Sequence, residues 1–343
     1  MKSFCHFTIA ALLLVAATTV EASADVGTLV VTASNTDKNQ LLVYDTAGNL
    51  LQTISTQGQG GVSGNAGGIS ADDGLVAVVN FSSKSISVFR ALNKGLQLKQ
   101  VITTASNPVS VAFGHGHLYV LGTTNVESHR VSGSNVNSSS DGVVMLLKAD
   151  GSSAQVGVVE DHLVITEKSN VIETVTLLSD GAVTGVATLV QNIPANVNAP
   201  FGLVTRGNNA YVTIAHADEI ALVRNGIVLT VTGSGTQHAP CWLTLVGPFL
   251  FSSNSPSMSV SRYAVYGQKI VQDAAVAAQL TGAPTDIDSG DGVVAVINAS
   301  GSVSHLSIFA VDEDGNLNLK AMPTINAPAN GVAVVRAGKE RGD

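Results

Sequence analysis

The side chains in this sequence that could transfer a proton are few, and two histidines stand out among them. His216 follows the apolar segment "YVTIA", and His238 directly precedes the segment "APCWLTL". An imidazole titrates near neutral pH, so two of them at neighbouring segment ends could act as general acid and general base. Glu167 follows "LVIT", and Asp286 alternates with Asp288 along one apolar segment. We therefore expect His216, His238, Glu167 and Asp286 to be the catalytic candidates.

Asparagine recurs at the ends of corresponding apolar segments. An amide side chain both donates and accepts hydrogen bonds, so a ring of them could bind the hydroxyls or the carboxylate of a sugar acid. A local role is the alternative, because Asn favours tight turns and bonds nearby backbone. The candidate ligand-binding residues are Asn35, Asn80, Asn254 and Asn298.

A glycine-rich stretch, "GQGGVSGNAGG", runs from Gly58 to Gly68. Its backbone amides could cradle an anion, or the stretch could be a flexible loop. It is not a nucleotide-binding loop, because no Lys-Ser or Lys-Thr pair follows it. The sequence also has no metal-ligand cluster, no haem motif and no Gly-x-Ser-x-Gly motif. We therefore expect no metal and no other cofactor.

Short runs rich in Val, Leu and Ile alternate with clusters of Gly, Asn, Asp and Ser along the chain after its first residues. This pattern predicts an all-β fold. Pro200, Pro240, Pro284 and Pro328 each open such a run, and their spacing is close to the length of one four-stranded propeller blade. A regular repeat of this length favours a β-propeller over a pair of sandwiches.

A second marker gives the number of blades. A glycine lies between the third and fourth predicted strand of each repeat, at Gly48, Gly95, Gly142, Gly181, Gly226, Gly267 and Gly315. We predict a seven-bladed β-propeller with four-stranded blades at about 60–104, 107–149, 152–194, 199–236, 239–280 and 283–325. The seventh blade combines residues 27–56 with Asn330–Arg336, so the two ends of the chain close the ring. The alternative is six blades with a disordered insert at 132–142.

The amino-acid composition argues against a disordered chain and against a nucleic-acid-binding protein. The 343 residues include 45% hydrophobic and only 12% charged residues, and the formal net charge is -8. A chain with this many hydrophobic residues can bury a large apolar core, which argues against disorder. With 17 Lys plus Arg against 25 Asp plus Glu, it presents no basic face for nucleic acid.

The first residues resemble a secretory signal. Lys2 is followed by an apolar stretch from Phe7 to Val20 and by the cleavage triplet Ala22-Ser23-Ala24. We expect a signal peptide at 1–24, a single propeller domain at 25–337 and a polar C-terminal tail at 338–343. The mature protein would be secreted or periplasmic, would have no membrane span after signal removal and would be a monomer.

Two segments of the sequence resemble the repeat of a known family. The segment 65–98, "NAGGISADDGLVAVVNFSSKSISVFRALNKGLQL", and the segment 292–319, "GVVAVINASGSVSHLSIFAVDEDGNLNL", resemble the repeat of seven-bladed lactonase-type propellers. These include 6-phosphogluconolactonase-like and carboxymuconate cyclase-like proteins. The resemblance implies lactone hydrolysis, or chemistry like that of a cycloisomerase, by polar side chains at the mouth of the ring. Where the family repeat commonly has Pro-x-His, this chain has Gly67, Val109 or Ser110, and Phe201-Gly202.

Two functions therefore follow from the sequence. The first is an exported propeller that binds or hydrolyses a small lactone or sugar-acid ligand at its mouth. The alternative is a non-catalytic propeller that binds a small ligand, or an envelope or extracellular component, and has lost the family's catalytic His positions.

Overall fold

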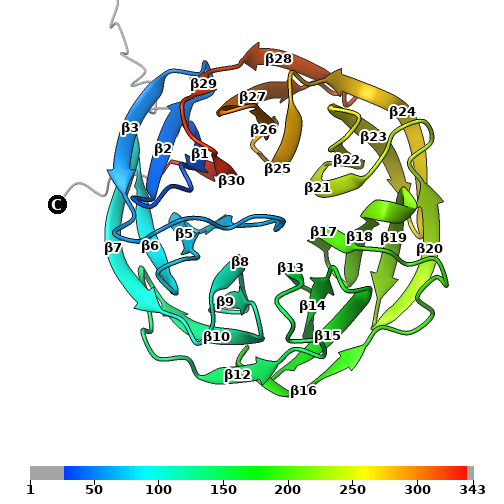
Figure 1. Ribbon diagram of the computed structural model, residues 1–343, viewed down its shortest axis with the longest axis horizontal. Helices are drawn as coiled ribbons and strands as arrows, with labels where there is room; N and C mark the ends of the chain where they lie inside the picture. Colours follow the sequence, from blue (N-terminus) through cyan, green and yellow to red (C-terminus); the bar gives the residue numbers. More distant parts are fainter. Residues whose placement is uncertain (1–26, 338–343) are drawn as a thin grey trace, which may run out of the picture.

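Antiparallel sheets stand around a central axis in the part of the chain that the computed structural model describes, residues 27–337 (Figure 1). The predicted signal peptide and the predicted tail at 338–343 lie outside the described residues. There are seven sheets among these residues, and in each one edge strand lines the axis while the opposite edge lies at the rim. The prediction of an all-β, seven-bladed propeller is confirmed, and the six-bladed alternative is wrong.

The blades follow one another along the chain. Blade two has β4 (Ile69–Asp72), β5 (Leu75–Asn80), β6 (Ser85–Leu92) and β7 (Gly95–Thr103). Blade three has β8 (Pro108–Gly114), β9 (His117–Gly122), β10 (Asn125–Ser132), β11 (Asn135–Val136) and β12 (Gly142–Met145). Blade four has β13 (Ser153–Val158), β14 (His162–Glu167), β15 (Val171–Leu177) and β16 (Val183–Leu189).

The second half of the ring repeats this order. Blade five has β17 (Pro200–Arg206), β18 (Asn209–Ile214), the short 3₁₀-helix η1 (Ala215–Ala217), β19 (Glu219–Arg224) and β20 (Ile227–Gly233). Blade six has β21 (Pro240–Val246), β22 (Phe249–Asn254), β23 (Ser259–Tyr266) and β24 (Lys269–Gln279). Blade seven has β25 (Ala283–Gly290), β26 (Val293–Ser300), β27 (Val303–Val311), β28 (Leu317–Ala321) and β29 (Thr324–Ile325).

Blade one joins the two ends of the described chain. It combines β1 (Thr28–Ala33), β2 (Gln40–Asp45) and β3 (Leu50–Ser55) with β30 (Asn330–Arg336), which is its inner strand. Strand β30 pairs antiparallel with β1, with Val31 opposite Ala333. The ring therefore closes through backbone hydrogen bonds between the first and last described strands, as predicted.

Blade three corrects one detail of the prediction. The sequence pattern places Gly142 in the turn between the third and fourth strands, but it lies within β12, while the turn itself contains Gly133. A Cβ atom at position 142 would lie 2.3 Å from the Val183 carbonyl oxygen of blade four, so the glycine allows two blades to approach closely. The Ser/Asn-rich stretch is an excursion that splits the outer strand into β11 and β12.

Tight hairpins connect the first two strands of several blades. Asp73 and Gly74 have φ angles of 42° and 76°, and Asp291 and Gly292 have φ angles of 49° and 74°. Two consecutive residues with positive φ are the signature of the type I′ turn, which matches the twist of adjacent strands. The Asp-Gly pairs of the sequence therefore encode the hairpins on one face of the ring.

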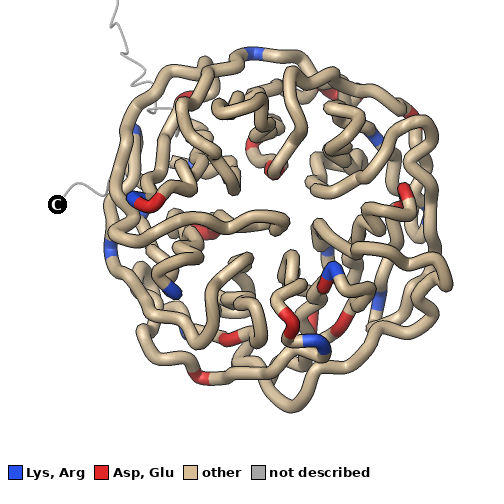
Figure 2. Tube along the Cα trace, in the orientation of Figure 1, with Lys and Arg blue, Asp and Glu red and all other residues tan. Residues whose placement is uncertain are grey.

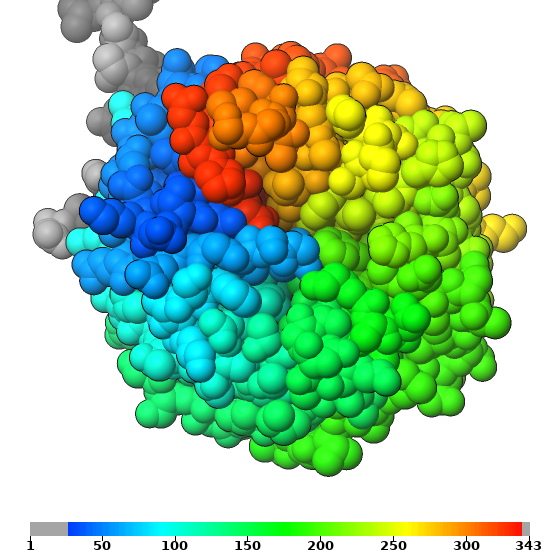
Figure 3. Space-filling view, in the orientation of Figure 1, coloured from blue at the N-terminus to red at the C-terminus, as the bar shows by residue number. Residues whose placement is uncertain are grey.

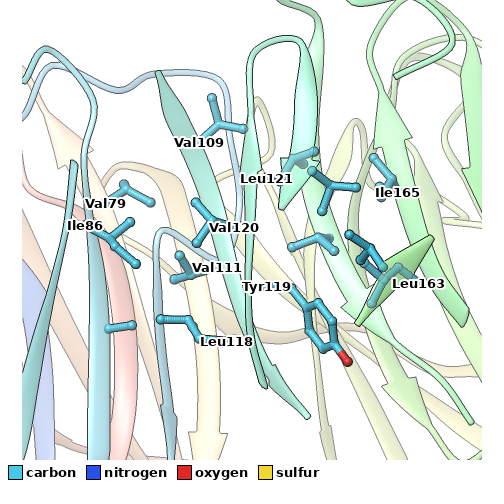
Figure 4. Packing of buried hydrophobic residues seen from close by; sticks show 14 of the residues in the cluster. Val79, Ile86, Val109, Val111, Leu118, Tyr119, Val120, Leu121, Leu163 and Ile165 are labelled. Atoms are coloured by element: carbon cyan, nitrogen blue, oxygen red, sulfur yellow. The ribbon is translucent and has the colours of Figure 1, made fainter. Parts of the chain in front are cut away.

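The core lies between neighbouring blades. Val79 and Ile86 of blade two pack near Val111 and Leu118 of blade three, and Leu163 of blade four belongs to the same buried cluster (Figure 4). Each sheet is covered by a blade on both faces, so short β-branched residues suit it better than aromatic ones. This packing accounts for the high aliphatic and low aromatic content.

Charged residues are sparse along the whole ring (Figure 2). Over residues 27–337 no helix has the length and apolar character needed to cross a membrane.

Candidate functional site

The mouth of the propeller is the face formed by the loops that enter the inner strands and the loops that join second to third strands. It faces the viewer in Figures 1 and 3. Among the predicted site residues, His216 on η1 and His238 in the loop before β21 lie in loops of this face. Glu167, Asp286 and three of the four asparagines belong to the strands beneath it.

His238 is held by an aspartate that the sequence did not single out. Its Nδ1 lies 2.9 Å from Asp218 Oδ2, and the other oxygen of that carboxylate accepts the backbone N–H of Ala239 at 2.7 Å. The backbone N–H of His238 donates to Ser257 Oγ at 2.9 Å. Because the His238 side chain is 66% exposed, its imidazole is oriented by Asp218 yet open to solvent.

His216 belongs to the same group. Asp218 has a left-handed φ of 57° and donates its backbone N–H to the carbonyl of Ala215, which places its carboxylate beside η1. Burial by itself would raise the pKa of Asp218. Hydrogen bonds from His238 and Ala239 and the charges of His238 and His216 instead bring that pKa below its usual value. We call His216, Asp218 and His238 the histidine cluster: His238 bonds the Asp218 carboxylate, and His216 lies two residues before Asp218, on η1.

Glu167 lies inside blade four, where it faces a second carboxylate. Its Oε1 accepts the backbone N–H of Lys148 at 3.1 Å, and Glu173 Oε2 accepts that of Leu147 at 2.9 Å. Both side chains are fully buried, and the other oxygen of each has no hydrogen-bond partner in the described part of the chain. Burial, reinforced by the charge of Glu167, raises the pKa of Glu173 to about 7, and burial also raises the pKa of Glu167.

Asp286 lies in the central channel on the inner strand β25. It accepts the backbone N–H groups of Ile287 at 3.0 Å and of Val332 at 3.2 Å. Asp288, two residues along, accepts that of Val334 at 2.8 Å. Burial raises the pKa of Asp286 to about 8 and that of Asp288 to about 6. Both carboxyl groups therefore bond the free edge of β30, the inner strand of the next blade.

Three of the candidate asparagines are buried inside their blades. Each donates its Nδ2 group to a serine of the third strand: Asn80 to Ser87 at 2.8 Å, Asn254 to Ser261 at 2.8 Å and Asn298 to Ser307 at 3.1 Å. All three side chains are fully buried. Glu167 and Glu173 occupy the corresponding places in blade four, because they pair with their neighbouring strands in the same register.

The glycine-rich stretch crosses the mouth. We call residues 58–68 the mouth loop; it runs from blade one toward the axis of the ring and back (Figure 1). Its base is held by Asn35, whose Oδ1 accepts the backbone N–H groups of Gly61 at 2.7 Å and of Val62 at 3.0 Å. Two of the amides that could have cradled an anion are therefore bonded to a side chain of the protein itself.

The tip of the mouth loop is bonded to blades on several sides of the axis. Asn65 donates its Nδ2 to the carbonyl of Val109 at 2.6 Å and accepts the Trp242 Nε1–H on its own carbonyl at 2.9 Å. Ala66 donates its backbone N–H to Ala154 at 3.1 Å. Asn65 and Ala66 are almost completely buried. The loop tip therefore fills the centre of the mouth, where it meets blades three, four and six (Figure 3).

Beneath the loop, the inner strands enclose a channel of about 550 Å³. Gly67 of the mouth loop lines one part of it, and His115, in the turn between β8 and β9, lines another. Because that turn lies on the face opposite the mouth, the channel extends toward the opposite face. Within the described range 27–337 no group of three or more His, Cys, Asp or Glu side chains could hold a metal ion.

Sequence reasoning missed the residues that organise the mouth. Asp218 follows His216 by two positions, a spacing that a turn can bring together, and this was the available signal. No such signal exists for three further residues that bond across the mouth to segments far away in the sequence: Asn65 to Val109, Lys168 to Gly64 and Asn330 to Val62.

No protein-family model matches the sequence, and no curated protein matches it significantly. Solved structures are similar to it across nearly the whole ring. A protein assigned as a 6-phosphogluconolactonase from Bacteroides fragilis has a TM-score of 0.66 and 14% identity, over 92% of this chain and 99% of that one. A protein with the same assignment from Bacteroides uniformis has a TM-score of 0.66 and 13% identity, over 90% of this chain and 100% of that one.

The periplasmic gluconolactonase PpgL of Pseudomonas aeruginosa is similar to the same degree, with a TM-score of 0.66 and 16% identity over 91% of this chain and 99% of that one. At this level of identity the likeness concerns the fold. The resemblance that the repeat suggested is thus supported by the three-dimensional structure, and the chain is a divergent seven-bladed propeller with the lactonase-like fold of these proteins.

Proposed function

We propose that the protein binds a small lactone or sugar-acid ligand at the propeller mouth and hydrolyses the lactone there. The observation that carries this proposal is the 2.9 Å contact between His238 Nδ1 and Asp218 Oδ2. A carboxylate bonded to Nδ1 fixes the tautomer that leaves Nε2 free to accept a proton. The exposed imidazole of His238 then has the arrangement of a general base.

The chemistry requires one base that becomes an acid. His238 would take a proton from water as the water oxygen attacks the lactone carbonyl carbon. When the ring C–O bond breaks, the same proton or one from His216 would pass to the leaving oxygen, and the product is the open hydroxy acid. Asp218 would stabilise the imidazolium that forms in between. Asp286 and Glu167 lie deeper in the propeller than the histidines. We therefore assign these two residues to the stability of the propeller rather than to proton transfer.

The test is hydrolysis of a panel of aldono-lactones by the purified mature chain. The double variant His216→Ala, His238→Ala should lose at least about 100-fold in kcat, the usual size of a general acid–base contribution. His162→Ala is the matched control, because His162 makes a similar 2.6 Å contact with Asp161 but on the opposite face. Turnover that survives in the double variant would refute the assigned pair.

One observation favours a second candidate, a non-catalytic binding propeller. The mouth loop fills the centre of the mouth. In addition, where the repeat of the lactonase-type propellers commonly has Pro-x-His, the sequence has Gly67, Val109 or Ser110, and Phe201-Gly202. A chain that binds gluconate or a lactone but turns over no member of the panel would support this candidate.

We also propose that the protein is exported, to the periplasm or out of the cell. The support is the leader-like segment Phe7 to Val20, together with the fold shared with a periplasmic gluconolactonase. Edman sequencing of the native protein should begin at Asp25. An N-terminus at Met1 would contradict export by cleavage.

A further inference from the structure

Three side chains from different blades donate hydrogen bonds to carbonyl oxygens of the mouth loop. Asn330 Nδ2 of blade one donates to Val62 O at 3.1 Å, and Trp242 Nε1 of blade six donates to Asn65 O at 2.9 Å. Lys168 Nζ of blade four donates to Gly64 O. In each of these three bonds the side chain of a blade is the donor, and a carbonyl oxygen of the mouth loop is the acceptor. The mouth therefore presents a set of converging donors, which the loop carbonyls now satisfy.

The donors of blades four and six form a continuous patch. Lys168 Nζ lies 5.8 Å from the ring centroid of Phe201, whose ring in turn contacts Trp242 edge to face at a centroid distance of 5.3 Å. Ala215, the neighbour of His216, belongs to the same buried cluster as Phe201 and Trp242. This buried cluster is therefore continuous along the chain with His216.

The ammonium group of Lys168 has neutral hydrogen-bond partners but no carboxylate partner among residues 27–337. Within this range the ammonium group bonds the carbonyls of Gly64 and Ser153 and no other group. No carboxylate among residues 27–337 lies within ion-pair distance of it. Burial lowers the pKa of Lys168 by removing the charge from water. The charge of Asp150, which lies beyond ion-pair distance, opposes this shift only in part, and no counter-ion contacts the ammonium group among the described residues. A ligand carboxylate would supply that counter-ion through a charge-assisted hydrogen bond, which is about twice as strong as a bond to a neutral carbonyl.

The mouth loop is suited to being displaced. Its residues carry no charged side chain, so it offers Lys168 only neutral acceptors. Gly61, Gly64 and Gly67 have positive φ angles of 91°, 58° and 62°, at the two flanks and the tip of the loop. Glycine has little steric barrier to other backbone conformations, so these positions can act as hinges.

We propose that Lys168, Trp242 and Asn330 form a binding site for the carboxylate of a sugar acid, and that the mouth loop occupies this site with its own carbonyl groups when no ligand is bound. The proposal deepens the proposed function and takes its ligand class from it. In this arrangement the mouth loop competes with the ligand carboxylate for the same three hydrogen-bond donors. Its removal should strengthen binding, whereas removal of an ordinary structural loop would weaken binding or leave it unchanged.

The test uses Trp242, the only tryptophan of the chain, as a fluorescent reporter. Titration of the wild-type protein with gluconate should change the Trp242 emission saturably, while glucose, which lacks the carboxylate, should not. A variant without residues 62–66, in which Gly61 is joined to Gly67, should bind gluconate at least about 10-fold more tightly. Lys168→Met in that background should lose at least about 10-fold, whereas Lys38→Met, an exposed lysine on the same face, should not.

The outcomes separate this proposal from the previous one. If the shortened variant folds, as judged by its β-sheet circular dichroism and its Tm, and binds gluconate no more tightly, the proposal is overturned. If it does not fold, Asn65→Ala in the full-length loop replaces it, because Asn65 anchors the tip to Val109 and Asn330. Unchanged affinity in that variant would equally overturn the proposal. Binding without turnover would contradict only the hydrolytic role of the histidine cluster, and turnover without any effect of Lys168→Met would contradict only the site described here.

Discussion

Asp288 on β25 accepts the backbone N–H of Val334 on β30 at 2.8 Å, across the boundary between blade seven and blade one. Asp286 does the same for Val332 at 3.2 Å. Strand β30 pairs with β1 on its other edge, so the strand that closes the ring is held on both sides. Edge strands otherwise present unpaired N–H and C=O groups, and here neighbouring carboxyl groups bond two of the N–H groups.

Asp288→Ala should destabilise the protein by about 1 to 3 kcal/mol, because it leaves the partly buried N–H of Val334 without its acceptor. Asp288→Asn keeps a carbonyl oxygen in that place and should cost far less. Urea unfolding followed by circular dichroism measures both. Equal losses in the two variants would show that the carboxylate charge, rather than the acceptor, matters.

The pair Glu167 and Glu173 should make stability fall with rising pH. The pKa of Glu173 in the folded state, about 7, lies above its value in the unfolded chain, so the folded state binds the proton more tightly. This contribution is complete below about pH 4 and is lost as pH rises through about 7. Glu173→Gln should therefore be more stable than the wild type at pH 8, by roughly 1 kcal/mol or more, and should differ little from it near pH 5.

The reason for the expected gain is that a glutamine side chain in place of Glu173 could accept from Leu147 through its oxygen and donate to Glu167 through its amide. Thermal unfolding at the two pH values gives the comparison. Glu160→Gln, at an exposed glutamate of the same blade, is the control. A Glu173→Gln variant that loses stability at both pH values would contradict the charge-repulsion explanation.

Asn254→Ala should lower stability by about 2 kcal/mol without lowering activity per folded molecule. The amide of Asn254 donates to Ser259 at 3.0 Å and to Ser261 at 2.8 Å, and the side chain is fully buried. Its removal leaves two serine hydroxyls with fewer partners inside blade six. Chemical denaturation and ligand titration, carried out on the same preparation, separate the two effects. A loss of ligand affinity with unchanged stability would instead support a direct binding role for this asparagine.

Asp218→Asn should lower kcat for lactone hydrolysis by at least about 10-fold and leave KM nearly unchanged. The amide could no longer hold the tautomer of His238 or stabilise its imidazolium form. The pH–rate profile is the decisive readout, because loss of the carboxylate should move its acid limb to lower pH. A variant with the wild-type profile would show that Asp218 only supports the backbone of Ala239.

Much of the fold was predictable because its signals are local. The Asp-Gly hairpins, the third-to-fourth strand glycines and the regular prolines each act within a few residues, and they indicated seven blades correctly. Gly142 was wrongly predicted to lie in a turn, because this glycine serves a contact with Val183 of the next blade. The positions of His216 and His238 at the same face of adjacent blades were also predictable, because both residues flank strands of those blades.

The amino-acid sequence by itself determined the strand period and the hairpins, since each depends on a short-range pattern, and the regular repeat of these signals indicated that the two ends of the chain share a blade. Only the tertiary structure decided that Glu167 faces Glu173, that the asparagines bond serines within their blades and that the mouth loop fills the mouth. Trp242 and Asn65, which meet at 2.9 Å, are 177 residues apart. Such a contact depends on how all the blades close around one axis, and no local pattern of residues encodes that distance.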